Sequence, residues 1–322
     1  MKKTLGILVL IALLLSSGCK NAKPAETKNS ESLDTFDTSA TIEPTVIYDK
    51  DNIKIAADEL TYGSFSAELS VTIENNSDKD LSFICGSSGY SVNSVNGCMI
   101  DDGYINCDVA PGESAQDIIS IGFNSLNMYG ITKISDMEIG FDISDDDYNS
   151  IYTGPLQIKT SVFDSYDYSV DRYQEIINNG ALENAFNCDV NYFSSDVLYD
   201  SYNVRICSSA VITNVDGETA LLLEIENNSN GIIYANTKDM YINGCPVYDS
   251  LWSSDSINAG KKYLVDISLS DLADEYEGNK SDMEEISEVS FTFSIGENWY
   301  EPANSKKISI SLPKIKIATD EA

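Results

Sequence analysis

The sequence predicts an all-β protein: two tandem immunoglobulin-like antiparallel β-sandwich domains that follow a disordered tether. Short runs that alternate apolar and polar residues predict half-buried strands, and clusters of Asn, Asp, Gly and Ser between these runs predict turns. The same motifs recur about 150 residues apart, which indicates a duplicated domain. A chain of 322 residues is long enough for each copy to bury its own core.

The clearest predicted strand lies in the sequence SFSAELSVTIE, residues 64–74. Ser and Glu occupy one set of alternating positions, as expected for a face in contact with water. The apolar residues that share the other face are Phe65, Ala67, Leu69, Val71 and Ile73.

Four pairs of motifs recur in the same order, which predicts the boundaries of the two copies. VIYDKDNIKI (46–55) matches VLYDSYNVRI (197–206), and IENNS (73–77) recurs at 225–229. VNGCMI (95–100) matches INGCPV (242–247), and MEIGFDI (137–143) matches VSFTFSI (289–295), so the offsets stay between 147 and 152. We define residues 46–163 as repeat 1 and residues 197–317 as repeat 2.

The residues between the repeats, 164–196, are expected to form a linker. Within it, VDRYQEIINNG (170–180) predicts a short helix, because Asp171 is a suitable N-cap and Asn179-Gly180 is a suitable stop.

The N-terminus has the layout of a secretory signal peptide over residues 1–18: two lysines, an apolar run from Leu5 to Leu15, and small residues before Cys19. The ending LSSGC resembles the lipobox of bacterial lipoproteins, with Ser16 where that pattern prefers Leu, Val or Ile. The resemblance implies cleavage before Cys19, lipidation of its thiol with palmitate or a similar acyl chain, and attachment to the cell membrane on its extracytoplasmic face. The alternative is an ordinary cleaved signal with an incidental cysteine.

Residues 19–45 are rich in Ser, Thr, Glu and Lys and offer little to bury, so they are expected to form the flexible tether. The matched motifs as a group resemble a repeat of uncharacterised surface lipoproteins of Gram-positive bacteria, in which an opening V-Y-D strand precedes I-E-N-N-S and V-N-G. The resemblance covers both repeats and implies a tandem sandwich in a cell-envelope lipoprotein, without any activity or binding residues.

The charge and the missing histidine exclude several classes of function. With 20 Lys and Arg against 52 Asp and Glu, the net charge of −32 repels polyanions, so nucleic acid is not an expected partner. The chain has no histidine, which removes every Ser-His or Cys-His dyad. No cofactor motif is present, and the protein is not expected to be an enzyme. A carboxylate pair of the glycosidase type is the remaining catalytic alternative.

Two groups of residues are candidates for bonds or metal ligands. Asp145, Asp146 and Asp147 lie in an acidic loop that offers oxygen ligands for calcium, although a solvated loop is the favoured interpretation and the calcium-loop motif is absent. Six cysteines follow Cys19, and the preferred disulfides are Cys98–Cys107 and Cys188–Cys207; buried free thiols are the alternative.

Trp252 and Trp299 occur only in repeat 2 and are candidate binding aromatics, with packing over a hairpin as the alternative. The prediction is a non-enzymatic envelope lipoprotein that displays two sandwiches for binding or adhesion to an extracellular protein or glycan. A structural spacer or envelope-assembly component is the alternative.

Overall fold

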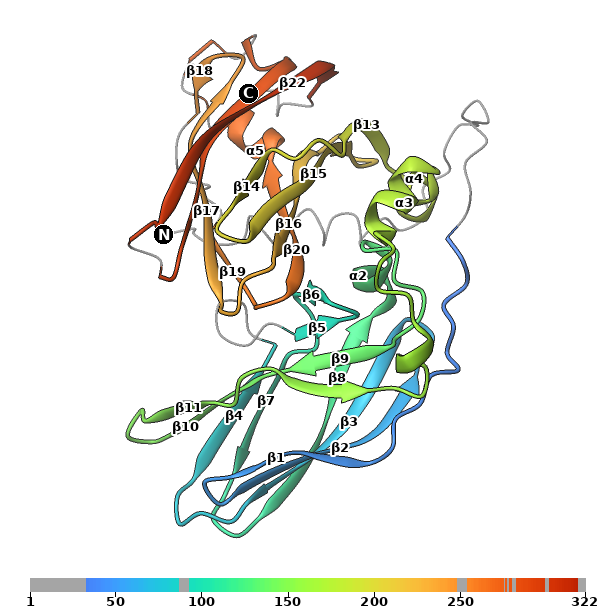
Figure 1. Cartoon of the computed structure of the whole chain (residues 1–322), viewed down its shortest axis with the longest axis vertical. Helices are drawn as coiled ribbons and strands as arrows, with labels where there is room; N and C mark the ends of the chain where they lie inside the picture. The colour runs from blue at the N-terminus through green and yellow to red at the C-terminus, as the bar shows by residue number, and fades with distance from the viewer. Residues whose placement is uncertain are drawn as a thin grey trace. The chain divides into compact units, whose positions relative to one another are not determined.

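The computed structural model describes residues 33–86, 93–247, 254–274, 276, 278–279, 282–298 and 301–317. The chain divides into two compact units, residues 33–173 with repeat 1 and the residues from Gln174 onward with repeat 2 (Figure 1). Both units are antiparallel β-sandwiches, so the predicted fold class is confirmed.

The first sheet of repeat 1 has the strand order β1-β2-β3-β8. Asp51 and Asn52 have positive φ angles of 54° and 59°, which is the backbone of a two-residue turn that matches the twist of the paired strands. The strands are β1 (Thr45–Lys50), β2 (Ile53–Tyr62), β3 (Ser66–Asn75) and β8 (Ser114–Gly122), and helix α2 (Phe123–Asn127) follows β8.

The facing sheet of repeat 1 is split in two. One part has the order β11-β10-β4-β7 and the other includes β12-β9-β5-β6. Gly140 separates β9 from β10, so the chain passes from one part to the other at this glycine. The strands are β4 (Leu81–Cys85), β5 (Asn93–Val95), β6 (Cys98–Ile100), β7 (Ile105–Val109), β9 (Asp136–Ile139), β10 (Phe141–Asp145), β11 (Ser150–Tyr152) and β12 (Leu156–Lys159).

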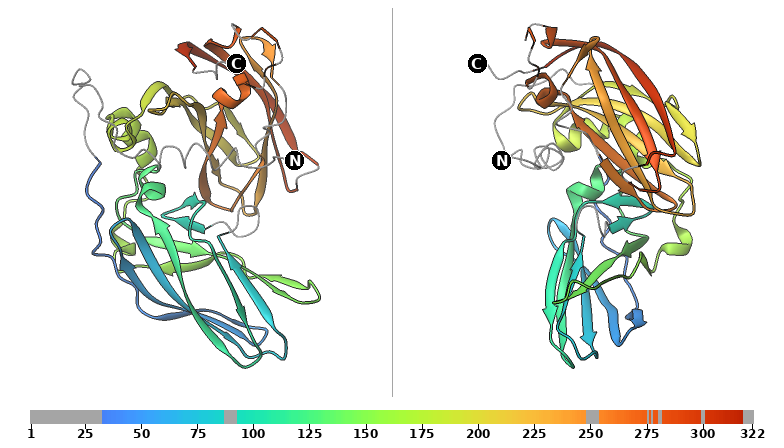
Figure 2. Two further views of the ribbon diagram at one scale, coloured as in Figure 1. Left: turned by 180° about the vertical axis from the view of Figure 1, so that it is seen from behind. Right: turned by 90° about the vertical axis from the view of Figure 1, so that its left-hand side faces the viewer.

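Repeat 2 has the same strand order with fewer breaks. Its first sheet contains β20-β16-β15-β13, with β14 paired to β15, and its second has the order β18-β17-β21-β22 with β19 paired to β17. The long hairpin of β21 and β22 appears in orange and red in both views of Figure 2. The elements are β13 (Asp189–Ser194), β14 (Tyr199–Ser201), β15 (Val204–Thr213), β16 (Thr219–Asn227), β17 (Ile233–Ile242), β18 (Cys245–Pro246), β19 (Ser254–Ile257), β20 (Lys261–Ser268), α5 (Leu269–Asp274), β21 (Glu285–Gly296) and β22 (Asn304–Lys316).

Each core is built from the apolar residues that alternate along the strands, because successive side chains of a strand point to opposite faces. In repeat 1, Leu69, Val71 and Ile73 of β3 are at most 1% exposed. Their counterparts in repeat 2 are Leu221, Leu223 and Ile225, which are fully buried. Phe65 does not join this face as expected: it precedes β3 and is 84% exposed.

The IENNS motif of repeat 1 ends in a buried clamp. The Asn75 side chain is fully buried, and its Nδ2 donates to the carbonyls of Lys79 (2.7 Å) and Val109 (2.8 Å). Its Oδ1 accepts from the backbone NH (3.0 Å) and the hydroxyl (2.6 Å) of Ser77. One side chain therefore ties the end of β3, the turn after it and the end of β7 together.

The IENNS motif of repeat 2 forms the same clamp. Asn227 is fully buried and donates to the carbonyls of Gly231 (2.9 Å) and Ile257 (2.8 Å), and it accepts from the backbone NH (3.0 Å) and hydroxyl (2.6 Å) of Ser229. The motif is repeated because this clamp is repeated. The first Asn of each motif acts through its buried side chain.

The Asn-Gly pairs of the two repeats are equivalent as well. Asn96 has φ 50° and donates to the Lys133 carbonyl (2.7 Å), while its Oδ1 accepts from the backbone NH of Ser135 (2.7 Å). Asn243 has φ 52°, and its Oδ1 accepts from the backbone NH of Ser287 (2.9 Å). Asn is suited to this position because it tolerates positive φ and its side-chain amide hydrogen-bonds to the neighbouring backbone.

Part of the predicted tether packs on repeat 1, which corrects the boundary at residue 45. The Phe36 ring stacks on Phe123 at 4.2 Å between centroids, and Asp37 Oδ2 lies 2.7 Å from Lys133 Nζ. Ala40 is fully buried, and its carbonyl accepts from the Tyr62 hydroxyl at 2.9 Å. An aromatic stack, an ion pair, buried Ala40 and hydrogen bonds to repeat 1 therefore hold this segment in place within an otherwise polar stretch.

The predicted linker is largely part of a folded unit. Helix α3 (Arg172–Asn178) falls within VDRYQEIINNG, Gly180 follows with φ 76°, and α4 (Ala181–Phe186) comes next. A 3₁₀ turn, η1, covers Phe163–Ser165. Strand β13 pairs with β15 and so belongs to the first sheet of repeat 2. Apolar residues that the linker prediction left unused, such as Leu182 and Phe186, are buried.

Candidate functional site

Three of the predicted site residues lie outside the described residues. These are the lipidation candidate Cys19 and the two binding candidates Trp252 and Trp299.

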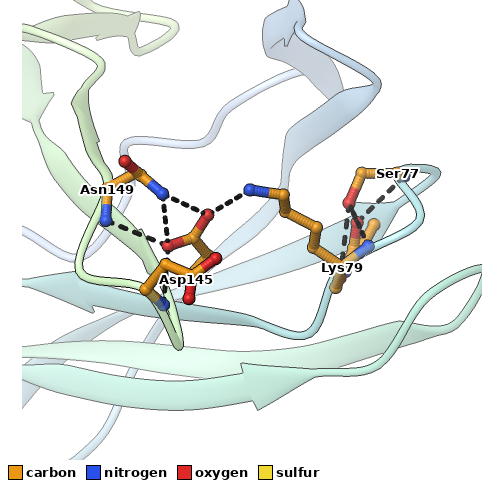
Figure 3. Close-up of polar contacts among 6 residues, drawn as sticks. Ser77, Lys79, Asp145 and Asn149 are labelled. Carbon is orange, nitrogen blue, oxygen red and sulfur yellow. Dashed lines mark hydrogen bonds and ion pairs between the residues drawn. The ribbon is translucent and has the colours of Figure 1, made fainter.

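The acidic loop lies at the tip of the β10–β11 hairpin (Figure 3). The Asp145 Oδ1 atom accepts from the backbone NH groups of Asp147 (3.0 Å) and Asn149 (2.9 Å). Its Oδ2 atom accepts from the Asn149 side chain (2.9 Å) and pairs with the Lys79 ammonium. Asp146 and Asp147 are exposed. The Asp145 carboxylate therefore closes its own turn and joins it to the turn after β3.

The Lys79 ammonium, reinforced by the Asn149 amide, holds the pKa of the Asp145 carboxyl well below its usual range. Because both oxygens already accept hydrogen bonds, this carboxylate is not arranged as a calcium ligand. Across the described ranges, no group of three or more Cys, Asp or Glu side chains is placed to hold a metal ion.

The preferred disulfide Cys98–Cys107 is wrong. Cys98 begins β6 and lies opposite Val95 of β5, whereas Cys107 lies in β7 opposite Phe83 of β4. The two strands belong to different parts of the split second sheet, and both cysteines carry thiols. The hairpin on which the pairing depended does not form.

The preferred disulfide Cys188–Cys207 is also wrong, for a reason of register. Asp189, next to Cys188, lies opposite Thr213, while Cys207 lies beyond Ser209, which pairs with Ser194 at the other end of β13. At about 3.3 Å per residue the two cysteines are on the order of 20 Å apart, and a disulfide needs Cα atoms within about 7 Å. Burial raises the pKa of both thiols to about 12, so they stay protonated at neutral pH.

Repeat 2 carries a groove that the sequence did not reveal, where the turn after β16 meets the ends of β17 and β21. Its volume is about 500 Å³. Tyr202, which is 62% exposed, and Ile232, which is 39% exposed, give it an apolar wall that is open to water. The lining residues are Tyr202, Ser229, Asn230, Gly231, Ile232, Ile233, Ile295, Gly296, Glu297 and Ala303.

The groove combines an aromatic ring, aliphatic side chains and one carboxylate, that of Glu297. Such a site binds by shape, apolar contact and charge. The groove was missed because its residues come from four separate segments, and no single segment has an unusual composition. Alignment of the two repeats position by position is the signal that would have exposed it.

No helix within the described residues is long and apolar enough to cross a membrane. No protein-family model matches the chain, and no curated protein matches it.

Among solved structures, a transglutaminase from red sea bream matches at 6% identity over 83% of this chain and 32% of that one, with a TM-score of 0.20. A chain from the complex of the SafA pilin with the SafB chaperone of Salmonella enterica matches at 8% identity over 82% of this chain and 98% of that one, with a TM-score of 0.20. An exo-chitosanase from Amycolatopsis orientalis matches at 10% identity over 83% of this chain and 26% of that one, again at 0.20. The chain thus spans about a third or less of the two enzymes, and likenesses this weak carry no functional argument.

Proposed function

We propose that the protein is a cell-envelope lipoprotein, anchored through lipid on Cys19 at the extracytoplasmic face. It displays two β-sandwich repeats and binds an extracellular protein or glycan through the groove of repeat 2. The signal-like N-terminus supports the anchor.

The observation that carries the binding role is the groove itself, an open recess of about 500 Å³ with exposed Tyr202 and Ile232 in its wall. Exposed apolar and aromatic side chains gathered in one recess favour a binding surface over a plain solvated one. The alternative role is a structural spacer, for which the groove would have no use.

The binding role is tested by filling the groove. A Cβ atom at Gly231 meets no other atom within 4 Å, so Gly231→Phe is accommodated and its ring occupies the recess. Protein and glycan arrays probed with the wild-type protein should yield a partner that Gly231→Phe loses. The matched control, Ser114→Phe at an exposed position of repeat 1, should keep it. Equal binding by all three proteins would contradict the groove as the binding site, and no binding by the wild type favours the spacer.

The anchor is tested separately. Cells expressing the wild-type protein should incorporate labelled palmitate into it, and Cys19→Ser should abolish the label and release the protein from the membrane fraction. Retention of the Cys19→Ser protein on the membrane argues against the anchor.

A further inference from the structure

The clamps place Lys79 of repeat 1 and Gly231 of repeat 2 at the same position. Each backbone carbonyl accepts from the clamp asparagine, at 2.7 and 2.9 Å. Each backbone NH donates to the hydroxyl of the motif serine, at 3.3 and 3.4 Å. The two positions differ in the side chain: repeat 1 has a lysine, and repeat 2 has a glycine.

Strand register places the acids Asp145 and Glu297 at the same position as well. Asp145 pairs with Leu81, two residues after Lys79. In repeat 2, Tyr234 pairs with Gly296, so one further step of the antiparallel ladder sets Glu297 opposite Ile233, two residues after Gly231. Each repeat therefore has a carboxylate at this strand end.

In repeat 1 the carboxylate of Asp145 forms an ion pair with Lys79 of the same repeat (Figure 3). Repeat 2 retains the carboxylate without the lysine. Among the described residues Glu297 has no ion-pair partner, and the groove lies beside Gly231, where the lysine of repeat 1 has its stem. The groove thus lies at the position where repeat 1 carries the Lys79 side chain.

We propose that the groove of repeat 2 binds the side chain of a lysine presented by a partner polypeptide. The ammonium group pairs with Glu297, as Lys79 pairs with Asp145 in repeat 1. The alkyl stem lies along Ile232 and Ile233, and the exposed Tyr202 ring offers a further contact for a cation. The net charge of −32 attracts a basic partner in addition. This inference rests on the proposed binding function and names the chemistry of the partner.

The test uses NMR titration of the ¹⁵N-labelled protein with the peptide acetyl-Gly-Lys-Gly-amide. The backbone amides of Gly231, Ile232 and Ile233 should shift and saturate with a Kd on the order of millimolar, which requires apolar contact of the lysine stem in addition to one partly exposed ion pair. The same peptide with an acetylated lysine Nζ lacks the charge and should bind about fivefold more weakly. Equal affinity of the two peptides overturns the inference.

Three variants of repeat 2 sharpen the test. Gly231→Lys restores the lysine of repeat 1 and should pair with Glu297 internally, so peptide binding should fall at least about tenfold while thermal unfolding shifts upward. Gly231→Gln, of similar length and without charge, is the matched control for bulk. Glu297→Gln should also abolish the charge-dependent part of binding, and unchanged peptide affinity in both Gly231→Lys and Glu297→Gln contradicts the inference.

Repeat 1 provides the reciprocal experiment. Lys79→Gly should open an equivalent site at Asp145, so that the lysine peptide shifts amides near residues 79–81 as well. Loss of array binding by Gly231→Phe combined with indifference to the lysine peptide would remove this inference alone. Array binding that survives Gly231→Phe would remove the proposed function itself.

Discussion

The two repeats share their internal clamps and differ in what their outer faces meet. Both bury the first asparagine of the IENNS motif, and both have a turn that contains an Asn-Gly pair. The outward positions of the same strands have diverged: Glu68 and Ser70 of β3 are half-buried and polar, whereas their counterparts Ala220 and Leu222 of β16 are at most 1% exposed. The polar residues of the clamps are the same in both repeats, whereas the outward strand positions differ in polarity and in burial.

The difference follows from the segment before repeat 2. Gln174 Nε2 of α3 donates to Glu224 Oε2 of β16 at 2.9 Å, which places α3 against the outer face of this sheet. Ile176 and Ile177 of the same helix are buried. A sheet with one face on the core and the other in water has alternating apolar and polar residues, while a sheet covered on both faces has apolar residues throughout. Helix α3 therefore covers part of the outer face of this sheet in repeat 2.

The largest expected effect comes from the clamps. Asn75→Ala removes a buried amide and leaves the Lys79 and Val109 carbonyls without their donor, so it should lower the free energy of unfolding by about 3 kcal/mol. Asn227→Ala should cost about as much. Hydrogen exchange read by mass spectrometry should show faster exchange in the mutated repeat only. If one variant is neutral, the two clamps are not equivalent.

The next largest effect is expected at the outer faces of the equivalent strands β3 and β16. Glu224 is 2% exposed and accepts from Ser208 Oγ (2.8 Å), besides its ion pair with Lys262 (3.2 Å), so Glu224→Ala should cost about 2–3 kcal/mol. The counterpart in repeat 1, Thr72→Ala, should cost about 0.5 kcal/mol or less, because Thr72 lies on an uncovered face. Denaturant unfolding of both variants measures the difference. Equal costs would show that the helical layer adds nothing at this position.

A smaller contrast is expected at the Asn-Gly turns. Replacement by glycine keeps the positive φ available and removes only the side-chain hydrogen bonds. Asn96 is 9% exposed, so Asn96→Gly should cost about 2 kcal/mol, while Asn243→Gly, at a half-buried position, should cost about 1 kcal/mol. Thermal unfolding of the two variants provides the comparison, and the reverse order would mean that burial does not set the cost.

The smallest effect is a pH dependence confined to repeat 1. The pKa of Asp145 is lowered by Lys79, so its contribution to stability is present above the ordinary carboxyl pKa near 4 and is lost as pH falls through the lowered pKa. Asp145→Asn should lower Tm by about 2 °C at pH 7 and by less at pH 3. A constant Tm difference between the two pH values would contradict the ion pair as its cause.

Period-two alternation and the recurring motifs were sufficient to predict the sandwich fold, because both signals lie within short stretches of sequence. The role of Asn75 was not predictable in the same way, since its partner Val109 is 34 residues away and an Asn after a strand is ordinary turn chemistry. The Cys188–Cys207 disulfide failed because the pairing of β13 with β15 decides which residues meet, and Cys98–Cys107 failed because β6 and β7 pair with different strands. The groove lies where repeat 2 has Gly231 in place of the Lys79 of repeat 1. This difference appears only when the repeats are aligned through their hydrogen bonds.

The packing of residues 33–44 on repeat 1 changes how far the protein could extend from a membrane. If Cys19 carries the proposed lipid, only the residues from 19 to 33 remain between the anchor and the first packed segment, and fully extended they reach about 50 Å. A free stretch up to residue 45 would have reached about 90 Å. The largest distance from the membrane at which a partner can be bound is then reduced by about half.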